Sequence, residues 1–168
     1  ALSGPSGYPL RYGYAVAGRV IGLGPHIPEE LMNRRVFAFY PHASHMNLRA
    51  TDIIPIPNDI EDRDALFLAN METAVTLMLD GRPVVGETVV VFGQGVVGLL
   101  ATALLGLHPL SHLVTVDRLP RRREISLIMG AHAAFDPRQC DALISHLSPA
   151  SEETLADSIS SVERIMAI

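Results

Sequence analysis

Cysteine is nearly absent from this sequence, which contains Cys140 and no other cysteine among its 168 residues. A single cysteine excludes an internal disulfide framework and agrees with a reducing compartment. We therefore expect a cytoplasmic location.

Long apolar runs and basic clusters are scarce as well. The longest apolar stretch, Val96–Leu107, is interrupted by Gly98, Thr102 and Gly106, and it is shorter than the roughly 18 residues of a membrane helix. Acidic residues outnumber basic ones by 18 to 13, for a formal net charge of −5, which excludes a basic nucleic-acid footprint. We expect neither membrane nor nucleic acid as a partner. The apolar fraction of 48% indicates a globular protein with a sizeable core.

The character of the chain changes near residue 60. The first part is rich in turns, with strands expected at 15–21, 36–40 and 53–57. In the second part, helices alternate with strands. Helices are expected at 61–79, where any break would fall at Asn70, and at 99–107, 120–129 and 139–147. Strands are expected at 88–92, 113–117 and 131–135. The tail has helical spacing at Leu155, Ile159, Val162 and Met166. The pattern predicts an α/β protein with two domains, 1–60 and 61–168.

The most informative stretch joins an apolar strand, a glycine-rich turn and an acid. Residues 88–92 are apolar and β-branched, and Gly93, Gly95 and Gly98 follow at once and open a helical run. Asp117 ends the next apolar strand, 19 positions after Gly98. This order predicts the dinucleotide-binding fingerprint, with a glycine-rich turn that binds no ligand as the alternative.

Each glycine of the fingerprint has its own physical reason. Gly93 permits a tight turn, Gly95 lets the backbone approach a pyrophosphate, and Gly98 lets the helix pack closely on the strand. The start of the helix offers backbone N–H groups and the positive end of its dipole to phosphates. The predicted cofactor-binding residues of this turn are Gly93, Gln94, Gly95, Val96, Val97 and Gly98.

Asp117 favours NAD over NADP. Its carboxylate can accept hydrogen bonds from an adenosine ribose, and its charge disfavours a 2′-phosphate. The arginines at 118 and 121–123 leave an alternative, because they could receive that phosphate or simply form a solvated helix start. We predict NAD as the cofactor, with Asp117 and Arg118 in its site and NADP as the weaker candidate.

A family resemblance covers much of the chain. It is carried by residues 13–20, 33–37, 73–74, 86–98 and 122–131. In this order they resemble the medium-chain dehydrogenase/reductase superfamily, the alcohol dehydrogenase relatives. Asn70–Ala74 and Phe92–Gly98 resemble in particular its bacteriochlorophyllide-type and uncharacterised "zinc-binding" dehydrogenases. The resemblance implies a partial GroES-like β-rich domain followed by a truncated Rossmann domain, a doubly wound parallel sheet.

The resemblance also implies an activity and residue roles. Members transfer a hydride between a nicotinamide cofactor and an alcohol or carbonyl substrate, in the cleft between the two domains. By position, Thr73 falls near the nicotinamide and Arg122 near the adenosine ribose. Members of the family often pair, so a homo-oligomer is one expected state.

The zinc ligands of the family are missing at the matching positions. Zinc members carry a Gly-His-Glu triplet where this chain reads Gly13-Tyr14-Ala15, and a further ligand would fall near Ala69. Tetrahedral zinc needs three or four Cys, His or carboxylate ligands, so we predict no metal site and no catalytic zinc. Tyr14 could donate a proton to the substrate instead, or be a packed aromatic.

Other candidates have ordinary alternatives. Glu72, beside Thr73, could serve as a catalytic base or as a first-turn acid favoured by the helix dipole. The pair His42 and His45 is expected to lie in a loop without a metal. The remaining histidines are expected to be isolated, namely His26, His108, His112, His132 and His146.

The end of the chain departs from the family pattern. A complete Rossmann fold has six strands, and we expect this chain to lack the strand beyond the switch point. It therefore resembles a fragment, a truncated gene product or a divergent remnant. One hypothesis is an NAD-dependent oxidoreductase without zinc, and the other is a non-catalytic remnant or nucleotide-binding module. A reading frame that continues past both ends would favour the enzyme, and a stop codon after Ile168 the remnant.

Overall fold

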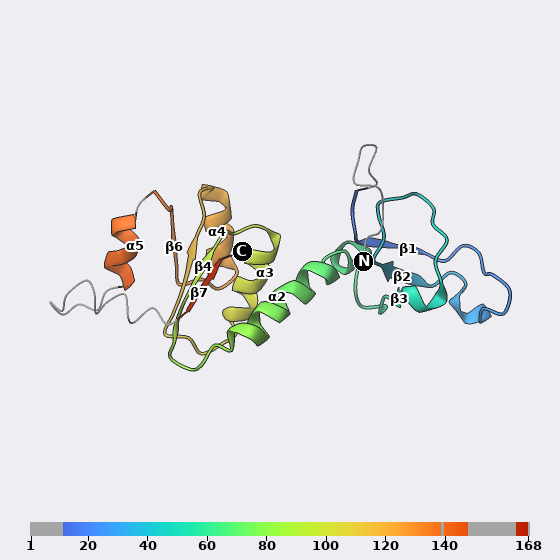
Figure 1. Cartoon of the computed structure of the whole chain (residues 1–168), viewed down its shortest axis with the longest axis horizontal. Coiled ribbons are helices and arrows are strands. Elements are labelled where there is room, and N and C mark those ends of the chain that lie inside the picture. Colours follow the sequence, from blue (N-terminus) through green and yellow to red (C-terminus); the bar gives the residue numbers. More distant parts are fainter. Residues whose placement is uncertain (1–11, 139, 148–163, 168) are drawn as a thin grey trace. The chain divides into compact units, whose positions relative to one another are not determined.

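The chain divides into two compact units, Ala1–Ala69 and Asn70–Ile168 (Figure 1). The computed structural model describes residues 12–138, 140–147 and 164–167. The predicted domain division at residue 60 stays a prediction. Each unit is described by itself below.

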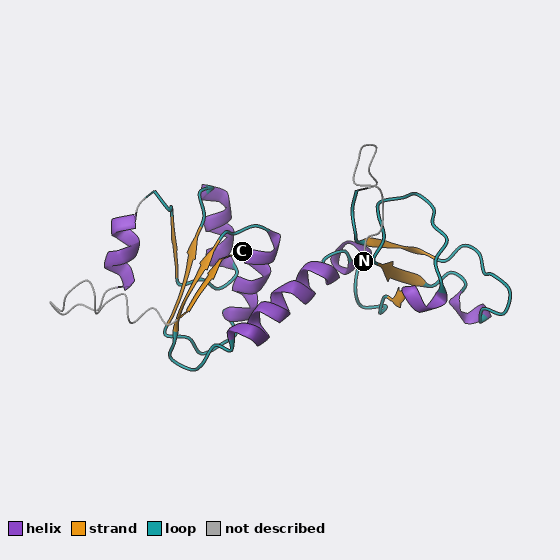
Figure 2. Ribbon diagram, viewed as in Figure 1, coloured by secondary structure: helices purple, strands orange, loops and turns teal. Residues whose placement is uncertain are grey.

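An antiparallel sheet organises the first unit. Its order is β1 (Val16–Arg19), β2 (Arg35–Ala38) and β3 (Ile54–Pro55), as Figure 2 shows in orange. Pro55 is accommodated because β3 is an edge strand, where a missing backbone N–H costs least. Phe37, 1% exposed, packs with Ile56 and Ala69 on one side of β2. The short helices of this unit are η1 (Glu29–Leu31), η2 (Ala50–Asp52) and α1 (Asp62–Ala65).

A parallel sheet organises the second unit. Its strands lie in the order β6-β5-β4-β7, and each pairs in parallel with its neighbours. The strand bounds are β4 (Thr88–Phe92), β5 (His112–Val116), β6 (Ala133–Phe135) and β7 (Arg164–Ala167). The helices are α2 (Leu68–Gly81), α3 (Val96–Leu105), α4 (Pro120–Ile128) and α5 (Cys140–Leu147). The predicted α/β class, with a β-rich part followed by a Rossmann part, is confirmed.

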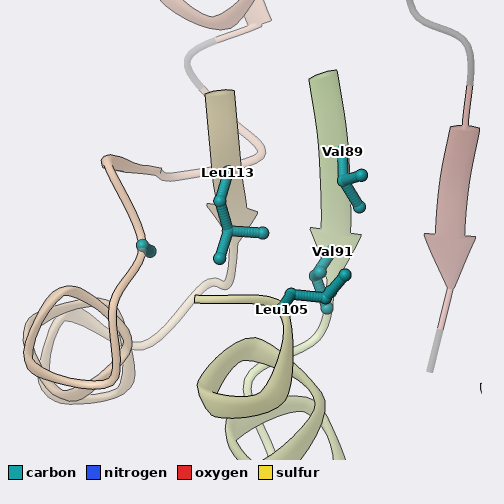
Figure 3. Close-up of a cluster of buried hydrophobic side chains, with 5 residues drawn as sticks. Val89, Val91, Leu105 and Leu113 are labelled. Atoms are coloured by element: carbon teal, nitrogen blue, oxygen red, sulfur yellow. The ribbon is translucent and has the colours of Figure 1, made fainter. Parts of the chain in front are cut away.

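Apolar clusters cover both faces of this sheet. On one face, Val89 and Val91 of β4 and Leu113 of β5 pack with Leu105 of α3 (Figure 3). The cluster on the other face, which side chains of α5 partly cover, consists of Val90, Val114 and Val116. Each fully buried Val or Leu side chain contributes roughly 1.5–3 kcal/mol. The sheet therefore holds β4 firmly enough to position the turn that follows it.

β7 corrects two expectations. Arg164–Ala167 pairs in parallel with β4, on the side opposite to β5, so the sheet does contain a strand beyond the switch point. The prediction of a helix at Met166 is also wrong, because pairing with β4 prevails over the helical spacing of the tail. Leu155, Ile159 and Val162 lie outside the described residues.

The helical region after residue 60 is interrupted earlier than its sequence indicated. We expected any break at Asn70, but the break falls at Leu66 and Phe67, between α1 and α2. Across the residues that the structure describes, no helix is both long and apolar enough to cross a membrane.

Candidate functional site

The glycine-rich turn connects the C-terminal end of β4 to the start of α3. Gly93 has a φ of 87°, a left-handed conformation that favours glycine, and its N–H donates to the Val116 carbonyl at 2.8 Å. Gly95 then caps α3 without a side-chain hydrogen bond. The first N–H groups of an α-helix have no partner within the helix, so this helix start is suited to an anion.

Gly98 and Gly95 face different surroundings. A Cβ built on Gly98 would collide with the carbonyl oxygen of Gly93, so the absence of a side chain lets α3 approach the turn. A Cβ built on Gly95 would meet nothing within 4 Å. The open side of Gly95 is therefore space that a ligand can enter, which is the fit that a pyrophosphate requires.

Asp117 follows β5 directly, and backbone N–H groups hold its carboxylate. Oδ2 accepts from the Gln94 N–H and Oδ1 from the Leu119 N–H, both at 2.7 Å. Arg122 Nη1 lies 3.6 Å from Oδ2. Burial alone would raise the pKa of Asp117, but these two N–H donors and the Arg122 charge together lower the pKa below its ordinary value. Asp117 is thus a fixed, ionised acceptor beside the glycine-rich turn.

A hollow of about 430 Å³ opens beside this carboxylate. It lies at the C-terminal ends of β4 and β5, where parallel α/β sheets bind ligands. Its size and mixed apolar and charged lining suit a nucleoside. The lining residues are Phe92, Gly93, Val116, Asp117, Arg118, Leu119, Arg122 and Pro137.

The four arginines near Asp117 divide into two pairs. Arg121 pairs with Glu124 at 3.1 Å, and Arg123 donates to the Asp117 carbonyl at 2.7 Å. Arg118 and Arg122 instead line the hollow. The predicted binding residues Asp117, Arg118 and Arg122 are therefore brought together, although their contact with a cofactor stays a prediction.

A second buried carboxylate, Asp136, fixes the neighbouring strand end. Arg138 Nη2 lies 2.6 Å and Arg123 Nη1 3.3 Å from its Oδ2. Hydrogen bonds from the side chain and backbone of Arg138, with the charges of both arginines, hold the pKa of Asp136 far below its ordinary value despite its burial. Because Arg123 also binds the Asp117 carbonyl, it connects the ends of β5 and β6. No local sequence pattern indicates this connection.

The Asp136 contacts predict a pH-dependent loss of stability. Asp136→Asn should lower the urea midpoint at neutral pH. A lowered folded-state pKa means that the carboxylate stabilises the fold above its unfolded pKa, and that this contribution is lost as pH falls through the folded pKa. The difference between the urea midpoints of wild type and Asp136→Asn should be largest above about pH 5 and should decrease below it. Urea unfolding by circular dichroism over a pH series measures this difference, and a difference independent of pH would contradict the assignment.

The other predicted site residues lie in different places. The Gln94 side chain is 0% exposed and binds Thr102 inside the unit, so it does not face the hollow. Val96 is 49% exposed at the helix start, and Val97 is half-buried. Thr73 and Glu72 lie on exposed positions of α2, in the second unit.

Glu72 and Tyr14 keep their candidate roles as predictions. Glu72 is the fifth residue of α2, which begins at Leu68, so the alternative of a first-turn acid does not apply. Tyr14 lies in the first unit and is 48% exposed.

Three histidines expected to be isolated lie together instead. The ring centroid of His112 lies 6.4 Å from that of His132 and 5.8 Å from that of His146. Nδ1 of His132 accepts the Leu113 N–H at 2.9 Å, which anchors that ring to β5. Among the described residues, no group of three or more His, Cys, Asp or Glu side chains could hold a metal ion.

The larger hollow, of about 950 Å³, lies in the first unit. It faces Val16, Val36 and Ala38 of the antiparallel sheet, and its polar groups include Arg19 and His45. It contains no carboxylate among its lining residues. The hollow beside Asp117 is smaller, but it lies between an ionised acceptor and the glycine-rich turn, so we regard it as the candidate functional site.

Parts of known dehydrogenases are similar to this chain in sequence. No family model matches the sequence. An alcohol dehydrogenase of Cupriavidus necator is 32% identical over 93 residues, which are 55% of this chain and 25% of that protein. The chain therefore spans a minor part of this relative.

Two solved structures show the same fold. One is the alcohol dehydrogenase RspB of Escherichia coli CFT073 in complex with NADH, with 17% identity and a TM-score of 0.66 over 90% of this chain and 58% of that one. The other is mycobacterial Rv1454c complexed with NADPH, with 24% identity and a TM-score of 0.66 over 83% and 47% of the two chains. In sequence over part of its length and in fold, the chain is similar to the medium-chain dehydrogenase/reductase superfamily, with a GroES-like portion followed by a Rossmann portion.

Proposed function

We propose that this protein is an NAD-dependent oxidoreductase of the medium-chain alcohol dehydrogenase type. The observation that carries the proposal is an ionised Asp117 beside a glycine turn whose Gly95 is open to a ligand. When bound, the nicotinamide cofactor would exchange a hydride with an alcohol or carbonyl substrate. The residues of this chain would bind and orient it.

Each part of the site has a separate task toward the cofactor. The Asp117 carboxylate would accept hydrogen bonds from the adenosine ribose, since each oxygen keeps a lone pair beyond its backbone bond. The N–H groups at the start of α3 would face the pyrophosphate, which passes on the open side of Gly95. Arg118 and Arg122 would border the ribose in the hollow.

NAD is proposed over NADP because Asp117 is charged and fixed. A 2′-phosphate would have to approach a carboxylate that cannot turn away, because two backbone N–H groups hold it. The relatives of known structure include one with NADH and one with NADPH, so the fold supports either cofactor. In this chain, the preference for NAD over NADP therefore depends on the charge of Asp117.

The proposal includes hydride transfer without catalytic zinc. Tyr14 and Ala15 stand where zinc members of the family carry histidine and glutamate, and the described residues offer no metal-binding group. The proposal therefore includes a subgroup poor in zinc ligands, the one that resembles the bacteriochlorophyllide-type and uncharacterised "zinc-binding" dehydrogenases. In it, Tyr14 is the candidate proton donor and Thr73 lies near the nicotinamide.

An NADH titration tests the function. The chain contains no tryptophan, so the nicotinamide emission can be followed directly, and we expect it to rise and shift to the blue on binding. Absence of binding at millimolar NADH would contradict the proposal. The same preparation should hold far less than one zinc per chain by metal analysis, and stoichiometric zinc would contradict the zinc-free part. Binding without turnover on any alcohol or aldehyde would favour a nucleotide-binding module.

A further inference from the structure

Gln94 is a polar turn residue that is completely buried. It lies between Gly93 and Gly95, in the turn proposed to face the cofactor, yet it is 0% exposed. A buried amide is costly unless hydrogen bonds satisfy it. Among the described residues, every buried side-chain nitrogen and oxygen has a hydrogen-bond partner. The Gln94 amide is therefore satisfied by hydrogen bonds inside the protein.

The contacts of Gln94 join three separate elements. Its Oε1 accepts from Thr102 Oγ1 of α3 at 3.0 Å, and its Nε2 makes a long contact of 3.4 Å with the Val91 carbonyl of β4. Its backbone N–H donates to Asp117 Oδ2 at 2.7 Å. One residue therefore connects β4, the body of α3 and the carboxylate at the end of β5.

The space around this amide is closely packed. Thr102 is 0% exposed, and a Cβ built on Gly98 would lie 3.6 Å from Gln94 Nε2 and collide with the Gly93 carbonyl oxygen. The Gln94 side chain thus occupies the gap between the turn and α3. Its length and its hydrogen bonds set how α3 sits on the turn.

We propose that Gln94, with Thr102, is a positioning residue for the dinucleotide. Its side chain fixes the start of α3, which faces the pyrophosphate, while its backbone fixes Asp117, which faces the ribose. The distance between the start of α3 and the Asp117 carboxylate is then fixed. Loss of the Gln94–Thr102 hydrogen bond therefore weakens NADH binding, even where the stability of the fold is restored. This inference rests on the proposed function.

The test compares Gln94→Met, Thr102→Val and the double variant. Each single change removes one partner and leaves the other buried without its hydrogen bond, so both stability and NADH affinity should fall. We expect NADH affinity to drop about 3- to 10-fold, the range for one lost hydrogen bond. In the double variant both partners are apolar and of similar shape, so stability should recover while NADH affinity stays low.

A second buried hydroxyl pair in the same unit provides the control. Thr115 Oγ1 and Ser126 Oγ lie 2.7 Å apart, and both residues are 0% exposed. Their other side-chain hydrogen bonds go to the carbonyls of Ala133 and Arg123, which lie outside the glycine turn. Thr115→Val should lower stability and leave NADH affinity within about twofold, a change of less than 0.5 kcal/mol. Urea unfolding and nicotinamide fluorescence give the two readouts for every variant.

The outcomes separate the two proposals. If wild type binds NADH and the double variant binds it equally well, Gln94 and Thr102 merely pack, and the positioning role is overturned while the function stands. If the Thr115 variant loses affinity as much as the Thr102 variant, affinity follows stability, and the positioning role is again overturned. If wild type does not bind NADH, the proposed function fails and this inference fails with it.

Discussion

Replacing Asp117 by alanine should weaken NADH binding about 10- to 100-fold and relax the preference for NADH over NADPH. The ribose would lose acceptors on a charged group, and such hydrogen bonds contribute about 1.5–3 kcal/mol each, or a factor of ten per 1.4 kcal/mol. NADPH should lose less, because the charge that disfavours its 2′-phosphate is removed, while Arg118 and Arg122 remain beside the hollow. Nicotinamide fluorescence titrations with both cofactors measure the two affinities.

Asp136→Ala is the matched control for this experiment. Asp136 is also a buried acid directly after a strand, and it also accepts backbone and arginine hydrogen bonds. It does not line the hollow, however. Its replacement should lower stability and leave the ratio of NADH to NADPH affinity unchanged. An equal change of that ratio in both variants would show that the Asp117 effect arises from a disturbed fold.

The unit from β4 to α3 could be predicted closely because its determinants are local. The β-branched run 88–92 is a strand with these bounds, since a strand buried on both faces is apolar without alternation. The strand expected at 113–117 is β5 (His112–Val116), so Asp117 lies directly after this strand and not within it. The helix begins at Val96, three residues before the expected start, with Gly95 as its N-cap. Gly98 therefore lies inside the helix, where it packs closely on Gly93.

The features that sequence reasoning missed depend on distant partners. β7 is a strand because β4 offers it an unpaired edge, which no property of the tail reveals. Parallel pairing of β5 with β6 brings His112 near His132, and His146 joins them from α5. The contact of Asp136 with Arg123 joins the end of β6 to α4. The burial of Gln94 was likewise invisible, because a polar residue between two glycines usually indicates an exposed turn.

Gly98→Ala should destabilise the second unit, against the usual effect of this substitution. In an ordinary helix interior, alanine is favoured over glycine by about 1 kcal/mol. Here the added Cβ would collide with the backbone oxygen of Gly93, and backbone cannot move aside as a flexible side chain can. Overpacking of this kind costs roughly 1–3 kcal/mol, or more. A lower urea midpoint is the expected result, and a raised midpoint would contradict the close approach of α3 to the turn.

Gly95→Ala should change the stability of the fold little and weaken NADH binding strongly. The backbone of Gly95 has a φ of −74°, which alanine adopts readily, and the added Cβ would meet no atom within 4 Å. We therefore expect the free energy of unfolding to change by less than about 1 kcal/mol. NADH affinity should nevertheless fall at least about tenfold, because the methyl group occupies the space through which a pyrophosphate approaches the backbone. Unaltered affinity in a stable Gly95→Ala protein would show that no dinucleotide passes this glycine. Gly95 and Gly98 lie three positions apart at the start of the same helix. Comparing the two alanine variants therefore separates a glycine that packing requires from a glycine that the ligand requires.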